Sequence, residues 1–368
     1  MRSYSYKVYA AICLIAGLML TLSGCGRGLP QAREMDDMAL MRTIGVDAGE
    51  QSGLLTVTVS SSRRSRGIQG EEEAPLILRS ERPSISGACL AMQGLSDSYV
   101  FYGHVDQLLL GEKLARQGVL ETLEHFSQDK ELGLGTQAWL IRGETAGAAI
   151  QAGKETGVDN RLSSLQADGE MGAAGLSRTV GEVLSDLLED GGAYLPALQL
   201  SQNEQGDTAL LEYGYGVLRS GALVGWLTGE GARGLELAEE RPGADLLEFE
   251  EATVRVDTAA LTCTPLITDG ILQGLELDLR LTAQVEEEHQ EGVDRGELRE
   301  KLQEREQKRL LLALEQLQQW NTDCLGLART AGAAQPEYWG LICQQWQERF
   351  PMLELQVKCT ATLIGAGR

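Results

Sequence analysis

The sequence predicts an α+β protein of more than one domain, with mixed α/β architecture and antiparallel-rich sheets. Residues 275–285 alternate strictly between apolar and polar side chains, as a half-buried antiparallel strand does. Residues 296–320 carry leucines on one helical stripe and contain no proline. A second helix is expected from Pro336, and residues 353–363 alternate again. This order of strand, helices and strand predicts a C-terminal domain in which a long helix packs on a sheet.

The first 24 residues have the three parts of an export signal. Arg2 and Lys7 precede an apolar run at residues 8–22, and two small residues follow it. The run has 15 residues, fewer than the roughly 20 that a membrane-spanning helix needs. The next residue is Cys25, and the sequence LSGC resembles a bacterial lipobox, in which the cysteine becomes the first mature residue and carries the lipid. We therefore expect Cys25 to be lipidated; the alternative is an ordinary signal peptide or a short N-terminal anchor.

The length and composition indicate how the rest of the chain is divided. Without residues 1–24 the chain keeps 344 residues, too many for one compact core. The stretch from 143 to 206 is rich in Gly, Ala and Ser, which is typical of a domain boundary, although an amphipathic helix is expected at residues 178–188. The expected divisions are a signal peptide at 1–24, a lipidated tether at 25–32, an N-terminal region at 33–205 with room for two subdomains, and a C-terminal domain at 206–368.

Within the N-terminal region the pattern predicts elements one by one. A short helix with acidic residues near its start is expected from Arg33, running into a strand at residues 43–46. Residues 55–59 alternate at period two and predict the next strand. A further strand is expected to reach about Leu110, followed by helical spacing that breaks at Gly118.

The charge excludes two classes of partner. The formal net charge is −22, and it becomes −24 when the signal segment with its two positive charges is removed. A surface this acidic repels phosphate backbones and anionic headgroups, so no nucleic-acid binding and no charge-driven docking on lipid are expected. A covalent lipid is then the natural means of holding the protein at a membrane.

No recognisable constellation for catalysis or metal binding is present. The three histidines, His104, His125 and His289, lack metal-site spacing and are expected to be structural or solvated. The glycine-rich segments lack the G-x-G-x-x-G spacing of dinucleotide sites, and G-x-S-x-G does not occur. We therefore expect no enzyme activity, no cofactor and no metal.

The cysteines beyond Cys25 also lack a metal or redox pattern. No C-x-x-C occurs, and an odd number at wide spacing favours buried thiols, with one bridge possible. In particular, the alternation of the last strand predicts that Cys359 points into the core. The five residues are Cys89, Cys263, Cys324, Cys343 and Cys359.

Two further features have a structural and a functional interpretation. The run Asn321, Thr322, Asp323 follows the long helix, and a C-cap and turn cluster is favoured over a functional site. Trp226 is expected on a strand that precedes a helix opening near residues 228–230, and a core position is favoured over a contact surface.

Several segments, in order and reaching both ends, resemble the Ger(x)C family of spore germination lipoproteins, the C subunits of nutrient germinant receptors. The chain departs from the family in its longer tether, GRGLPQAR, and in residues 143–206, which match poorly. The matching segments are the lipobox at Cys25, REMDDMALMRTIGVD (33–47), YGHVDQLLLGEKLARQGVLETLEHFSQDKELGLGTQAWLIRG (102–143), YGYGVLRSGALVGWLTGEGARGL (213–235), WNTDCLGLAR (320–329) and WQERFPMLELQVKCTAT (346–362).

The resemblance implies three mixed α/β domains in a row and a non-enzymatic role. It implies a lipid-anchored protein on the outer face of the inner spore membrane, in contact with the multi-pass A and B receptor subunits. The alternatives are an extracytoplasmic solute-binding lipoprotein of a transporter and an exported hydrolase. Solute-binding proteins commonly repeat βα units around a cleft, whereas long antiparallel strands are expected here. A hydrolase needs a nucleophile and base at a recognisable spacing, and the sequence lacks such a pair.

Overall fold

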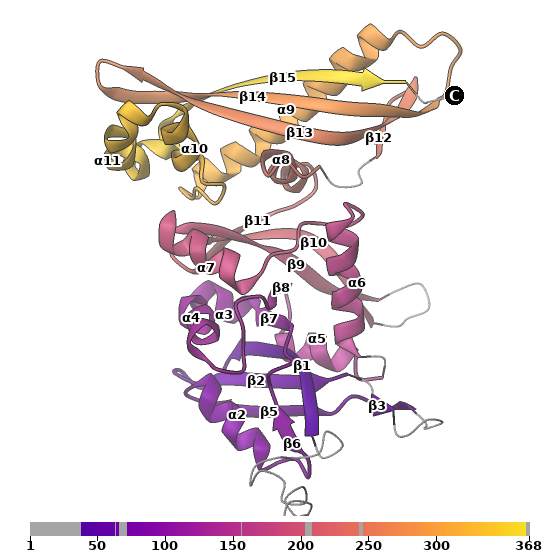
Figure 1. Ribbon diagram of the computed structural model, residues 1–368, viewed down its shortest axis with the longest axis vertical. Coiled ribbons are helices and arrows are strands. Elements are labelled where there is room, and N and C mark those ends of the chain that lie inside the picture. The colour runs from indigo at the N-terminus through magenta and orange to yellow at the C-terminus, as the bar shows by residue number, and fades with distance from the viewer. Residues whose placement is uncertain are drawn as a thin grey trace, which may run out of the picture. The chain divides into compact units, whose positions relative to one another are not determined.

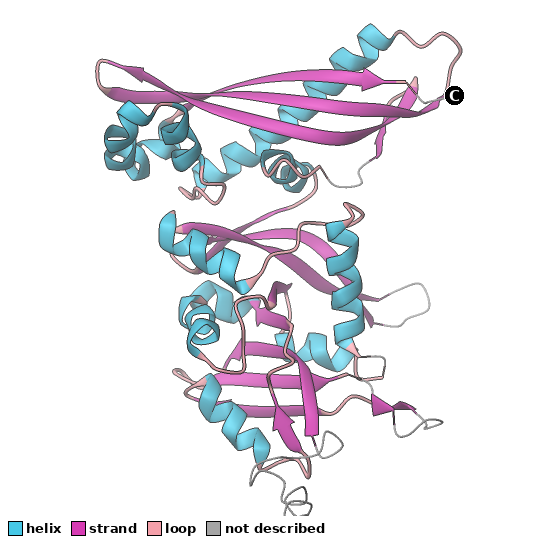
Figure 2. Cartoon of the chain, in the orientation of Figure 1, coloured by secondary structure: helices cyan, strands magenta, loops and turns pink. Residues whose placement is uncertain are grey.

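The computed structural model describes residues 38–62, 64–65, 72–155, 157–202, 208–242 and 246–365. Its strands form two main sheets with helices packed on them, so the expected α+β class is confirmed (Figures 1 and 2). The chain from Leu40 onward forms one compact unit.

The first sheet is mixed. In spatial order its strands are β11 (Ala222–Leu227), β10 (Thr208–Arg219), β9 (Gly192–Gln202), β8 (Gln137–Arg142), β7 (Gln107–Gly111), β1 (Met38–Ala48), β2 (Leu55–Ser61) and β5 (Ile77–Arg82), and β6 (Tyr99–Phe101) pairs with β1. The four central strands β9, β8, β7 and β1 are parallel, and the pairs toward both edges are antiparallel. The sequence did not predict this parallel centre.

Helices connect the strands of this sheet, because parallel neighbours need a crossover. They are α2 (Ile85–Gln93), α3 (Glu112–Gln117), α4 (Leu120–Gln128), α5 (Ala146–Ala152), α6 (Val158–Glu170) and α7 (Val180–Glu189). The expected break falls between α3 and α4, where Gly118 has φ of 132°. The helix expected at 178–188 is α7, which Thr179 opens with a capping box to Glu182. Two short strands, β3 (Arg64–Ser65) and β4 (Glu72–Glu73), form a separate small sheet.

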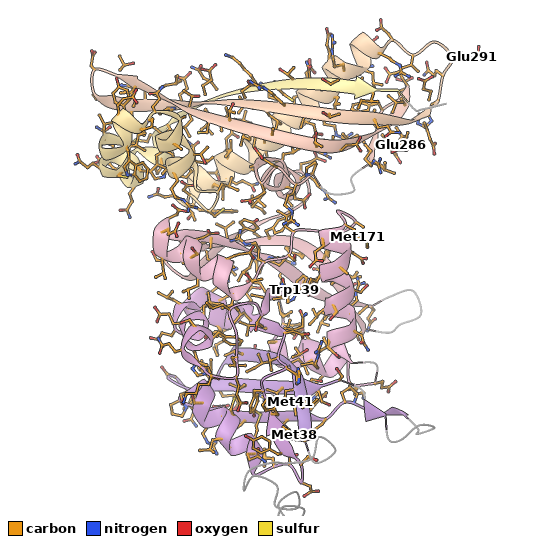
Figure 3. The ribbon with its side chains drawn as sticks, viewed as in Figure 1. Met38, Met41, Trp139, Met171, Glu286 and Glu291 are labelled. Atoms are coloured by element: carbon orange, nitrogen blue, oxygen red, sulfur yellow. The ribbon has the colours of Figure 1, made fainter. Side chains whose placement is uncertain are left out.

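The helix expected from Arg33 is wrong in the part that is described, since the chain is already a strand at Met38. Residues 33–37 lie outside the described residues. β1 is hydrogen-bonded to β2 on one side and β7 on the other, and Met41 is completely buried, as is nearly all of Trp139 on β8 (Figure 3). A strand covered on both faces shows no clean alternation, and its pairing outweighs the helical preference of a Met- and Leu-rich segment.

The second sheet has the order β12 (Leu246–Glu248), β13 (Ala252–Thr268), β14 (Ile271–Glu288) and β15 (Glu354–Ile364). β13 and β14 form a long hairpin whose turn residues, Asp269 and Gly270, have φ of 51° and 72°, the two positive values that a tight hairpin turn requires. β15 runs parallel to β14. The accompanying helices are α8 (Glu230–Ala238), α9 (Arg295–Gln319), α10 (Leu327–Ala334) and α11 (Trp339–Arg349), with short 3₁₀ turns η3 (Pro336–Tyr338) and η4 (Phe350–Met352).

The long helix, the helix after Pro336 and the final strand are confirmed as α9, α11 and β15; α10 was not predicted. α9 buries the expected leucine stripe, Leu298, Leu302, Leu310, Leu314 and Leu317. The stripe is interrupted by a buried ion pair, since Arg309 Nη1 lies 3.0 Å from Glu306 Oε1 and Arg309 also pairs with Glu230 at the start of α8. α8 can approach α9 this closely because Gly234 has no side chain: a Cβ there would lie 2.0 Å from the Arg309 carbonyl oxygen.

The expected boundary between the two regions, at residues 205/206, falls between two strands of the first sheet that pair with each other. β9 and β10 pair antiparallel from Gln202 opposite Thr208 to Gly192 opposite Arg219. One hydrophobic cluster contains Tyr194 and Tyr215 from these strands together with Leu277 of β14 and Leu314 of α9. The two sheets therefore share a core.

A single carboxylate ties the end of β1 to α5. Asp47 is 5% exposed, and its two oxygens accept the backbone N–H groups of Ala146 (2.7 Å) and Gly147 (2.9 Å). Burial raises the pKa of Asp47, while these two hydrogen bonds lower it. The contact joins residues about a hundred apart and satisfies two of the donors that a helix N-terminus leaves without an intrahelical partner.

We expect Asp47→Ala to lower the free energy of unfolding by about 2 to 3 kcal/mol, because it leaves buried donors of α5 without an acceptor. Urea denaturation of the protein lacking residues 1–31 measures this change, with the exposed Asp97 replaced by Ala as the control. A loss no larger than that of the control would contradict the structural role of Asp47.

Candidate functional site

The candidate lipidation residue, Cys25, lies outside the described residues, so its lipidation stays a prediction. Across the part of the chain that the structure describes, no helix is both long enough and apolar enough to cross a membrane.

A charged cavity of about 490 Å³ lies beside α7 and β9 and is here called the charged cavity. Its lining comes from α7, from the residues just after α8 and from the turn before α10. The ionisable side chains that line it are Arg178, Glu182, Asp186, Glu239, Arg241 and Arg329. Three guanidinium groups and three carboxyl groups thus face one space.

Arg178 forms the wall of this cavity. Its guanidinium carbon lies 4.4 Å from the centroid of the Tyr194 ring, a cation–π contact, and the same group pairs with Asp186. Burial disfavours the charge on Arg178, but Tyr194 and Asp186 more than compensate and raise its pKa. Burial raises the pKa of Tyr194, and the nearby Glu239 carboxylate raises it further. Arg178 is therefore a fixed positive charge held by two partners.

Arg329, on α10, closes the other side. It pairs with Glu189, lies 2.8 Å from Asp190 Oδ2 and lies 4.0 Å from Asp186 Oδ1. Burial raises the pKa of Asp190 to about 6, although the charge of Arg329 lowers it. The acids at the end of α7 are thereby joined to α10, since each of them lies within ion-pairing distance of the same guanidinium group.

Asp323 holds the turn that precedes α10, the helix that carries Arg329. It is 6% exposed, and its carboxylate accepts the backbone N–H groups of Leu325 (3.3 Å), Leu327 (3.0 Å) and Ala328 (3.0 Å). Burial raises the pKa of Asp323, and these three bonds lower it. Asn321 takes a φ of 47°, and the Thr322 hydroxyl donates to the Trp320 carbonyl. The turn interpretation of these residues is confirmed, but the C-cap of α9 is Trp320, and Asp323 instead accepts N–H groups at the start of α10.

The other sequence candidates lie apart from the charged cavity. Trp226 is on β11 before α8, as expected, but it is half-buried, with its ring edge-on to Tyr213 at 5.9 Å. His104 and His289 are exposed, and His125 is half-buried on α4. Within the described ranges no three His, Cys, Asp or Glu side chains gather as a metal site would require.

The five cysteines are free thiols. Cys263 and Cys324 are buried, Cys89 and Cys359 are half-buried, and Cys343 is exposed. Burial raises the pKa of Cys359 to about 12, and the side chain packs against the core cluster, as its place in the alternation predicted. A thiol held protonated in this way is a poor nucleophile.

Sequence reasoning missed the charged cavity. Arg178, Glu239 and Arg329 stand far apart in the chain and form no motif, and only the folding of α7, α8 and α10 brings them together. Two of its arginines, Arg178 and Arg329, are already paired with acids of the same protein, which makes the cavity a joint between α7 and α10.

The raised pKa of Asp190 makes stability depend on pH. The folded protein binds this proton near pH 6, whereas the unfolded chain binds it near the ordinary value of 3.8. Protonation between these values favours the folded state, so the contribution of Asp190 to the free energy of unfolding rises as the pH falls from about 7 to about 4.

We expect Asp190→Asn to remove this dependence. The free energy of unfolding of the variant minus that of the unaltered protein should be greater at pH 7 than at pH 4, by up to about 3 kcal/mol. Urea denaturation at the two pH values, with the exposed Asp97→Asn as control, measures it. A difference that does not change with pH would show that Asp190 titrates normally.

Comparisons with known proteins cover nearly the whole chain. The family described as spore germination protein N-terminal domain matches residues 31–200, and the family described as spore germination B3/GerAC like, C-terminal, matches residues 213–367. The crystal structure of the GerBC protein is similar in fold, with a TM-score of 0.57 and 18% sequence identity, over 87% of this chain and 96% of that one. No curated protein sequence matches the chain. With both family matches in chain order, the chain belongs to the GerAC-like family of spore germination proteins.

Proposed function

We propose that the chain is the lipid-anchored C subunit of a spore nutrient germinant receptor. Cys25 carries the lipid and holds the protein on the outer face of the inner spore membrane. There the protein acts without catalysis, through contacts with the multi-pass A and B subunits. The observation that carries this proposal is the match of both halves of the chain, in order, to the spore germination families.

The charge and the site chemistry support the same function. At a net charge of −22 the protein is repelled by anionic headgroups, so a covalent lipid is needed to keep it at a bilayer. Confinement to the membrane raises its effective concentration near membrane partners well above that of a freely diffusing protein. Arg178 and Arg329 of the charged cavity are already paired with acids of the same protein, as expected for a protein that works by contact.

Copurification from spores tests the proposal. Tagged protein in mild detergent should bring down a multi-pass A or B subunit, and Cys25→Ala should recover at least tenfold less of it, because assembly then depends on free diffusion. Cys343→Ala, at an exposed cysteine, is the matched control and should behave like the unaltered protein.

Two results would contradict the proposal. Equal recovery with Cys25→Ala would show that the anchor has no part in assembly. Recovery of a transporter permease in place of the receptor subunits would support the solute-binding alternative.

A further inference from the structure

The outward face of α2 is uncharged. The helix reads ISGACLAMQ, whereas 23% of the residues in the whole chain are charged, which would give about two in nine. Leu90 on this face is 77% exposed, and Leu95, just beyond the helix, is 62% exposed. A helix that faces only water normally carries charged residues on its outer side. The composition of α2 therefore fits a surface that is covered by another molecule.

This face borders a concave, mainly apolar space of about 520 Å³, here called the α2 groove. Leu90 and Cys89 lie on one side, Val100 of β6 and Leu132 lie at the buried base, and residues 128–131 after α4 form the far rim. The volume is within the range of sites that hold a ligand or a few side chains of a partner.

Hydrogen bonds fix the walls of the groove relative to one another. Gln93 Oε1 accepts the Val100 N–H at 2.9 Å, and the Tyr102 hydroxyl donates to the Cys89 carbonyl at 3.2 Å. On the far rim, Glu131 Oε2 accepts the Tyr102 N–H at 3.1 Å. Because these bonds fix α2, β6 and the rim to one another, the groove is preformed and binding does not have to order its walls.

The groove lies beside the first half of β1, the strand that the structure describes first after Cys25. β6 pairs with β1, and shortly after β6 the Asp106 N–H donates to the Arg42 carbonyl at 3.0 Å, near the start of β1. Thirteen residues separate Cys25 from Met38, and fully extended they reach roughly 45 Å. With Cys25 in the membrane, the groove is within reach of proteins embedded in the same bilayer.

Charge selects the kind of occupant. Asp129 and Glu131 line the rim against a single Lys130, and the chain as a whole is strongly acidic. An anionic lipid surface is disfavoured here, whereas an apolar segment flanked by basic residues matches both the base and the rim.

We propose that the α2 groove is the docking surface for an apolar, basic-flanked segment of a membrane-embedded partner. The proposal rests on the proposed receptor function and names the surface through which it acts.

Leu90→Glu tests this surface in the full-length, anchored protein. A carboxylate in place of the most exposed leucine leaves folding unchanged but puts an uncompensated charge in the docked groove beside two acids. At equal amounts of membrane-bound protein, the multi-pass partner recovered should fall at least tenfold. The matched control is Leu188→Glu on α7, 66% exposed and not part of the groove, which should recover the partner as the unaltered protein does.

Each other outcome overturns the proposal in a distinct way. If the unaltered protein recovers the partner and Leu90→Glu recovers as much, the groove is not the surface and the receptor function stands. If the unaltered protein recovers no multi-pass partner, both proposals fail. Binding of the Cys25→Ala protein to phosphatidylcholine vesicles that Leu90→Glu abolishes would make lipid the occupant. A dimer that Leu90→Glu dissociates on gel filtration would make it a second copy of the chain.

Discussion

The fold depends on the position of β1 inside the first sheet. This strand is hydrogen-bonded to β2 along Met41–Ala48 and in parallel to β7 along Thr43–Val46, and its end is tied to α5 through Asp47. It is also the first strand that the structure describes after the proposed anchor at Cys25. A force on the anchor therefore acts on a strand that is hydrogen-bonded on both sides, and not on an edge strand with one neighbour. The β6 strand that shapes the α2 groove pairs with this same β1.

The two concave sites differ in what they leave available. In the charged cavity Arg178 and Arg329 already have acidic partners, and the result is a joint that fixes α10 to α7. In the α2 groove Gln93 and Tyr102 fix the walls by hydrogen bonds, and the exposed surface is an uncharged leucine, with the charged residues confined to the far rim. A protein that acts by contact needs rigid joints such as the charged cavity, and it needs an open surface such as the α2 groove.

Periodicity predicted the elements that have one wet and one dry face. The strands β14 and β15 and the helix α9 are of this kind, and their expected bounds agree with the structure to within a few residues. It failed where both faces are covered: a strand was expected only at residues 43–46, whereas β1 already includes Met38, and the parallel centre of the first sheet was not anticipated. α10 was missed because it is short and opens on Asp323, which alone reads as a turn residue.

The charged cavity and the α2 groove were harder to predict from the sequence. The cavity residues come from distant segments, so no spacing joins them. For the groove a signal existed in the uncharged run ISGACLAMQ, but only the structure shows that its leucine points outward. The proposed lipobox is the opposite case, since it is suggested by the sequence and lies outside the described residues.

Mass spectrometry of the N-terminal peptide of the protein, isolated from membranes of its spore-forming host, shows directly whether Cys25 carries a lipid. We expect a chain that begins at Cys25 and carries a diacylglycerol thioether on its sulfur. A membrane-derived chain that retains residues 1–24, or that begins elsewhere without lipid, would contradict it.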